Sequence, residues 1–201
     1  TGKCTITPSR TKSATSSPRP GFTRTSRRAR HGTAYPPQRF RAQKGQDLLK
    51  QALAIQEDCY AEDHVEIGET LGNLSKTYIA LGQSKEAIKL LTRSLKILSH
   101  YYGKDHVYVA RTESYLGDAY FNLGRFQEAH TVLNKVLKIK EQSYEKDNIS
   151  IAITLTTLGK VYAATGQNNK ASQAWHRALE IIRTSYGVHH PFTKRVDDLL
   201  A

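Results

Sequence analysis

The sequence lacks the features that identify several large classes of protein. It contains no methionine and only two cysteines, Cys4 and Cys59, which form no spaced metal-binding set. No apolar run reaches the ~18 residues that a membrane-spanning helix needs. Glycine-rich phosphate loops and His-Glu-x-x-His motifs are also missing. We therefore expect no catalytic site, no cofactor, no metal site and no membrane partner.

Acidic residues are missing from the N-terminal part of the chain. The first one is Asp47, whereas residues 1–41 hold ten Lys or Arg, thirteen Ser or Thr and five of the six prolines. Most of the net charge of +12 lies in this segment, because the other 20 basic and 18 acidic residues leave only +2. Such a segment buries too little apolar surface to offset its ordering entropy. We predict a basic, disordered tail over residues 1–41.

Four arginines of this tail form a dense basic cluster: Arg24, Arg27, Arg28 and Arg30. The cluster can contact phosphates or act as a nuclear import signal, and its Arg- and Ser-rich surroundings resemble an organelle transit peptide. Aromatic side chains for base stacking are sparse, with only Phe22, Tyr35 and Phe40. A solvated tail without a function is the default interpretation. We expect a cytoplasmic protein, with the nucleus or an organelle as alternatives.

A repeat of 42 residues organises the rest of the chain, residues 42–201. The aligned positions are Tyr60, Tyr102, Tyr144 and Tyr186; Leu74, Leu116 and Leu158; Gly82, Gly124 and Gly166; and Ala87, Ala129 and Ala171. Self-similarity at a fixed period is typical of units that bury their apolar faces by stacking on one another. The apolar spacing predicts two antiparallel helices per unit, over 65–81 and 85–101 in the first, each ending near a glycine.

Within each unit, the spacing of small and large residues resembles the tetratricopeptide repeat. That signature is Leu-Gly-x-x-Tyr in the first helix and Ala-x-x-x-aromatic in the second. It is present at Leu116–Tyr120 and Leu158–Tyr162, and at Ala171 with Trp175, which we expect in the core. The long period and the Gly-x-Asp-His joint are similar to the kinesin-light-chain class. The resemblance implies an all-α fold, an α-solenoid of stacked helix pairs that binds other proteins.

The array is expected to be incomplete at both ends. Its full repeats span about residues 62–103, 104–145 and 146–187, and partial repeats cover 42–61 and 188–201. The first partial repeat matches a second helix without its first helix, so we expect that helix to expose apolar surface. Truncation from a longer array would explain this, as would a tail joined to the repeats by an error in gene prediction.

The joints between repeats carry recurring polar residues. Asp63, Asp105 and Asp147 each stand just before a helix start, so we predict that they cap these helices. The joint histidines are His64, His106, His189 and His190. Because equivalent joints lie about one repeat apart, we interpret these histidines as joint residues and not as ligands of a shared metal ion.

The candidate partner-binding surface is the face of the first helices opposite their Leu-Gly-Tyr core. At 100° per residue four positions of each repeat share that face, which in the tetratricopeptide fold lines the concave groove, as the resemblance implies. The predicted contact residues are Glu69, Asn73, Lys76, Arg111, Tyr115, Asp118, Asn122, Thr157 and Lys160, with Ala80, Ile153 and Ala164 beside them. Arg111 can pair with a carboxylate, Tyr115 offers a stacking face and Asn122 can bond an extended backbone. The alternative is an ordinary solvated helix face.

These observations leave three functional hypotheses. The preferred one is a scaffold or adaptor that binds a partner peptide on the concave face of the array. The second is a nucleic-acid-associated protein in which the basic tail supplies the affinity, which would fall steeply with salt. The third is a regulatory fragment of a larger signalling ATPase, since the chain does not begin with methionine.

Overall fold

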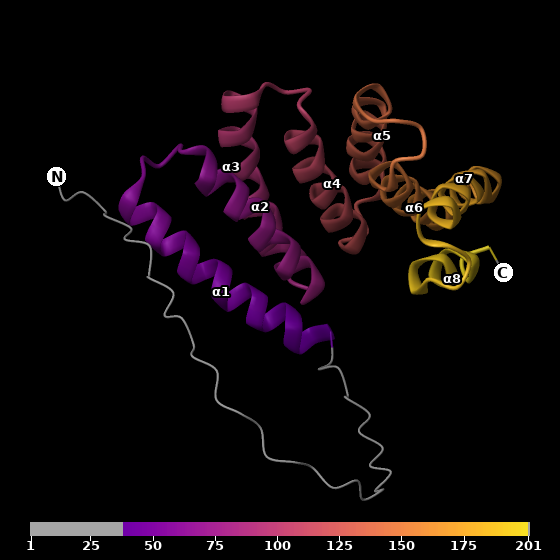
Figure 1. Ribbon diagram of the computed structural model, residues 1–201, viewed down its shortest axis with the longest axis horizontal. Coiled ribbons are helices and arrows are strands. Elements are labelled where there is room, and N and C mark those ends of the chain that lie inside the picture. The colour runs from indigo at the N-terminus through magenta and orange to yellow at the C-terminus, as the bar shows by residue number, and fades with distance from the viewer. Residues whose placement is uncertain (1–37, 201) are drawn as a thin grey trace, which may run out of the picture.

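The computed structural model describes residues 38–200, which form a curved row of helices in chain order (Figure 1). The helices are α1 (Gln38–Cys59), α2 (Val65–Ala80), α3 (Ser84–Tyr102), α4 (Val107–Asn122), α5 (Phe126–Ser143), α6 (Ile149–Ala164), α7 (Asn168–Tyr186) and α8 (Pro191–Asp197). The predicted α-solenoid is confirmed. The tail arginines at 24–30 lie outside the described residues, so the predicted disorder and binding there stay predictions.

Successive helices pack against one another as the repeat predicts. Helices α2 and α3, α4 and α5, and α6 and α7 form the three complete pairs, and α2 and α3 begin and end within one residue of the predicted bounds. The first helices also contact one another across the repeats, α2 with α4 and α4 with α6. These contacts place α2, α4 and α6 on the inner side of the row.

The two ends of the array hold single helices. Helix α1 starts at Gln38, so it includes residues 38–41, which the sequence analysis placed in the tail. This start directly follows the prolines at positions 36 and 37 of the sequence. Within residues 38–200, no helix combines the length and the apolar character needed to cross a bilayer.

Small residues on the first helices receive large side chains from the second helices. In the third repeat Trp175 of α7 lies against Gly159 of α6, is only 9% exposed, and donates its indole N–H to the Thr156 carbonyl oxygen at 3.2 Å. The predicted core position of Trp175 is therefore confirmed. In the second repeat Leu133 lies against Gly117 in the same way.

Histidines, not aspartates, cap the first helices. Nδ1 of His64 and of His106 each accepts the backbone N–H two residues later at 3.3 Å, and His190 does so at 3.2 Å. In the third repeat Asn148 takes this role, with its Oδ1 accepting the Ser150 N–H at 2.8 Å. The predicted caps at Asp63, Asp105 and Asp147 are wrong by one residue. A neutral imidazole nitrogen at the following position reaches the free N–H groups just as a carboxylate would.

Three of the tyrosines that recur at the joints stack on the capping histidines. Tyr60 stacks on His64 with ring centroids 4.1 Å apart, Tyr102 stacks on His106 at 4.6 Å, and the Tyr186 ring lies 4.5 Å from that of His190. Tyr102 and Tyr186 end second helices, Tyr60 directly follows the end of α1, and each histidine directly precedes the next first helix. The aromatic pair therefore holds the capping imidazole in place. The joint role predicted for these histidines is confirmed.

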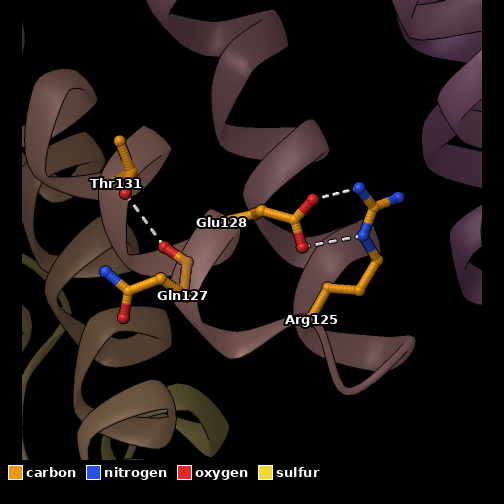
Figure 2. A network of polar contacts seen from close by, with 4 residues as sticks. All are labelled: Arg125, Gln127, Glu128 and Thr131. Carbon is orange, nitrogen blue, oxygen red and sulfur yellow. Dashed lines mark hydrogen bonds and ion pairs between the residues drawn. The ribbon is translucent and has the colours of Figure 1, made fainter.

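A glycine and an ion pair lie at the turn between α4 and α5, inside the second repeat. Gly124 has a φ of +73°, and α5 starts two residues later without a side-chain cap. Figure 2 shows the polar contacts at this start: the Arg125 guanidinium donates two hydrogen bonds to the Glu128 carboxylate, and the Thr131 hydroxyl donates to the Gln127 carbonyl. The hydrogen bond from Arg125 holds the pKa of Glu128 below its usual value.

We predict that Gly124→Val destabilises the array by about 1–2 kcal/mol, because valine is strained at positive φ. A Cβ at this position would meet nothing within 4 Å, so the cost is in the backbone and not in a steric clash. Thermal unfolding should show a melting temperature lower by several degrees. Gln127→Val, at an exposed helical position in the first turn of α5, is the control. An unchanged melting temperature for Gly124→Val would contradict the register.

Candidate partner-binding surface

The predicted contact residues lie on α2, α4 and α6, three helices that contact one another in sequence. Their side chains differ in accessibility. The exposed ones are Asn73, Lys76, Asn122 and Lys160, and the partly buried ones are Glu69, Arg111, Tyr115, Asp118 and Thr157. The surface is therefore a semi-buried polar face in which several groups already have partners.

Arg111 is held in place by an aromatic ring and not by a carboxylate. Its guanidinium lies 5.0 Å from the ring centroid of Tyr108, one turn earlier on α4. The Nε atom is buried and makes no hydrogen bond to any of the described residues. A buried N–H donor without an acceptor is unfavourable. Because Nε has almost no exposed surface, an acceptor from outside would reach this partly buried guanidinium through its terminal nitrogens.

The ring beneath Arg111 belongs to an aromatic cluster that the sequence analysis missed. Tyr108 is 39% exposed, and its centroid lies 5.2 Å from that of Tyr102 and 5.3 Å from that of His106. The Tyr102 hydroxyl donates to Glu69 Oε1 at 3.1 Å. Burial, and then this carboxylate, raise the pKa of Tyr102. The sequence held one signal for the cluster, because residues three apart on a helix are neighbours and Tyr108 precedes Arg111 by three.

A second cation and ring pair lies between α2 and α4. The Lys76 ammonium is 5.9 Å from the ring centroid of Tyr115. Tyr115 is partly buried, and Lys76 is exposed. A cation at this distance from an aromatic face is weakly attracted to it, by about 0.5–1 kcal/mol at exposed sites. The pair links the first and second repeats and keeps a positive charge at the surface.

Asp118 and Thr157 bind each other. The Thr157 hydroxyl donates to Asp118 Oδ1 at 3.0 Å and joins α4 to α6. Burial raises the pKa of Asp118, although the Thr157 hydrogen bond and the positive charges of Lys160, Lys140 and Lys76 act in the opposite direction. Because their polar atoms are engaged, these two residues connect neighbouring repeats even without a partner.

Asn122 stands apart from the cationic pair. It ends α4, and its amide makes a long contact of 3.5 Å with the Ser84 hydroxyl at the start of α3. Eleven residues of helix separate it from Arg111, which corresponds to about 16 Å. A segment that touched both residues would have to run along most of α4.

Cations dominate the available charges of this face. Glu69 accepts from Tyr102 and Asp118 accepts from Thr157, whereas Lys76 and Lys160 are exposed and Arg111 lacks an acceptor for Nε. Among residues 38–200 no group of His, Cys, Asp or Glu side chains is arranged to hold a metal ion. The chemistry that this face supports is therefore recognition of a carboxylate-bearing, partly aromatic or extended segment.

Comparison with known proteins relates this geometry to a family. Sequence profiles described as Tetratricopeptide repeat match residues 38–99, 80–142 and 151–192. No curated protein matches the sequence.

Several solved structures share the fold. The crystal structure of the nearly identical TPR-like repeats of a candidate kinesin light chain from Podosopora anserina has a TM-score of 0.62 and 24% identity, with 86% of each chain covered. BtubC (BKLC) from P. vanneervenii has a TM-score of 0.61 and 23% identity over 76% of this chain and 60% of its own. Apo RapI has a TM-score of 0.61 and 22% identity over 81% and 43%. At these identities the likeness concerns the fold.

Proposed function

Because the chain belongs to the tetratricopeptide-repeat family, in its kinesin-light-chain-like class, we propose that it is an adaptor that binds a segment of a partner protein along α2, α4 and α6. The family supports a protein-interaction scaffold in general. The finer assignment, to the inner face of the middle repeat, rests on one observation: the Arg111 guanidinium is stacked on Tyr108, and its Nε is buried without an acceptor. We propose the cytoplasm as its location.

The proposed mechanism is preorganisation. Stacked helices hold Arg111, Tyr108 and Tyr115 in fixed positions before a partner arrives, so the array loses little conformational entropy on binding. A carboxylate of the partner would accept from Arg111 in a charge-assisted hydrogen bond. The rings of Tyr108 and Tyr115 would cover apolar or aromatic parts of the same segment.

We predict that Arg111→Ala combined with Tyr115→Ala weakens partner binding about fivefold or more, because arginine and tyrosine are common anchors of interfaces. The measurement is capture of partners from nuclease-treated lysate on the immobilised full chain, quantified by mass spectrometry. Helicity measured by circular dichroism should not change, since neither side chain belongs to the buried core.

The matched control is Lys89→Ala combined with Lys138→Ala, which removes two exposed cations from the second helices α3 and α5. This control should retain the partners. Equal capture by the Arg111 and Tyr115 variant would remove the inner face from consideration. Loss of all partners on nuclease treatment of the parent chain would favour the nucleic-acid hypothesis instead, and its salt dependence would then be measured.

A further inference from the structure

Helix α1 exposes large apolar side chains along one side. Phe40 is 59% exposed, Leu48 57% and Ile55 60%. Leu48 and Ile55 belong to a run with alternating spacings of four and three residues, whose members are all exposed: Lys44, Leu48, Gln51, Ile55 and Asp58. This spacing places the five side chains on one narrow stripe of the helix, as in the seam of a coiled coil. We call these five residues the α1 stripe.

The repeat register shows that the apolar positions of the α1 stripe are covered elsewhere in the array. The residues one repeat after Leu48 and Ile55 are Leu90 and Ile97, and both pack with Ile67 and Leu71 of helix α2. In the second repeat the equivalents Val132 and Ile139 lie in a cluster with Ala110 of α4. A second helix of this fold therefore normally presents these positions to another helix.

The C-terminal end of a second copy does not supply such a helix. Helix α8 corresponds to a first helix, but its residues at the positions of Ile67 and Leu71 are Thr193 and Asp197. Thr193 is buried and donates to the Gly187 carbonyl at 2.7 Å, and Asp197 accepts from Arg183 at 2.9 Å. At these two positions α8 therefore carries polar side chains that are already bonded within the chain, where a first helix of the array carries apolar ones. Head-to-tail stacking of copies, α8 on α1, is disfavoured.

The α1 stripe is complementary to itself when one copy is reversed. From its N-terminal end the stripe carries a cation, an apolar residue, an amide, an apolar residue and an anion. In an antiparallel pair the N-terminal half of one stripe faces the C-terminal half of the other. Lys44 then lies opposite Asp58 and Gln51 opposite Gln51 of the other copy. Leu48 lies within one residue, about 1.5 Å along the axis, of Ile55. A parallel pair would instead place Lys44 against Lys44 and Asp58 against Asp58, which is repulsive.

We infer that two copies of this chain associate through α1, packed antiparallel about a two-fold axis at Gln51, with the α1 stripe as the interface. The interface is isologous, so it closes at a dimer and leaves no further stripe exposed. A single helix pair buries little area, so the dimer is weak, with a dissociation constant on the order of micromolar. The inner faces of α2, α4 and α6 do not take part in this contact.

Sedimentation velocity of the full chain tests the inference. The mass should rise from the monomer value of 22.6 kDa towards twice that value as the concentration increases from about 1 to 100 µM. Leu48→Glu with Ile55→Glu should raise the dissociation constant at least about tenfold, because it places carboxylates in the centre of the interface. Both residues are exposed in the single chain, so the melting temperature of the monomer should not fall. Val188→Glu, at a similarly exposed apolar residue in a joint, should leave dimerisation unchanged.

Charge reversal tests the orientation. Lys44→Glu should weaken the dimer about threefold or more by facing Asp58 with a like charge, and adding Asp58→Lys should restore it. A chain that stays monomeric at about 100 µM would overturn the proposal, as would a Leu48 and Ile55 variant that dimerises like the parent. A monomer whose melting temperature falls in that variant would show that the chain covers the stripe itself, which also overturns it.

Discussion

Gly159→Ala should destabilise the array by about 2–3 kcal/mol, the range of a severe overpacking change. A Cβ atom at this position would stand 2.1 Å from the indole Nε1 of Trp175 and 2.4 Å from its Cδ1. The ring is almost fully buried and donates to the Thr156 carbonyl, so it cannot move aside without losing that hydrogen bond. Relief therefore requires α6 and α7 to separate. Urea unfolding at constant pH measures the loss of stability.

A compensating substitution distinguishes this steric cause from a general effect on the helix. The positions of Gly159 and Trp175 are occupied in the first repeat by Ser75 and Leu91, both fully buried. A side chain at the small position is therefore compatible with leucine opposite it. Gly159→Ala with Trp175→Leu should be less destabilised than the sum of the two single variants. Asn169→Ala, at an exposed site on α7, is the control, and additive losses in the double variant would contradict the packing explanation.

Lys140→Met should stabilise the protein by about 1–3 kcal/mol near neutral pH, because it removes a buried charge. Lys140 is 3% exposed, and its ammonium donates to the Ser114 hydroxyl at 3.0 Å, the Thr154 hydroxyl at 2.9 Å and the Ser150 carbonyl at 3.3 Å. Both hydroxyls also donate to helix carbonyls, so they keep a partner when the lysine is replaced. The equivalent residues, Leu98 and Ile182, are apolar and fully buried.

The pH dependence of this effect has a defined sign. Burial lowers the pKa of Lys140 to about 8, although the charge of Asp118 acts against that shift. An unfolded lysine has a pKa of about 10.4, so the unfolded state binds the proton more tightly than the folded state. The destabilisation by Lys140 is therefore full below a pH of about 8 and disappears as the pH rises through about 10.4.

The stability difference between Lys140→Met and the parent chain should accordingly shrink across this pH range. Urea unfolding of both proteins at about pH 7 and about pH 10 measures it. Lys138→Met removes an exposed lysine two residues earlier on the same helix and serves as the control, with little effect at either pH. A gain from Lys140→Met that is the same at both pH values would be inconsistent with a buried, titrating ammonium.

Much of the candidate site could be located from the sequence, but its internal pairing could not. The rotation of 100° per residue was enough to identify the face of α4 that carries Arg111, Tyr115 and Asp118. It could not show that Asp118 accepts a hydrogen bond from Thr157 on α6, because that contact joins residues 39 positions apart. The sequence analysis also did not select Tyr108, because its three-residue spacing from Arg111 shows a helical neighbour but not the contacts with Tyr102 and Arg111 that make it part of the site.

The sequence by itself determined the repeat, the core and, to within one residue, the bounds of α2 and α3. A period of 42 residues repeats apolar spacing, small residues and turn glycines, and these act locally, within one helix pair. It also held an unused signal, since Lys140 aligns with Leu98 and Ile182. Only the tertiary structure decided which buried polar groups have a hydrogen-bond partner and which do not. That property depends on distances between side chains of different repeats, which no local pattern encodes: Lys140 is satisfied by two helices, and Arg111 is left without an acceptor for Nε.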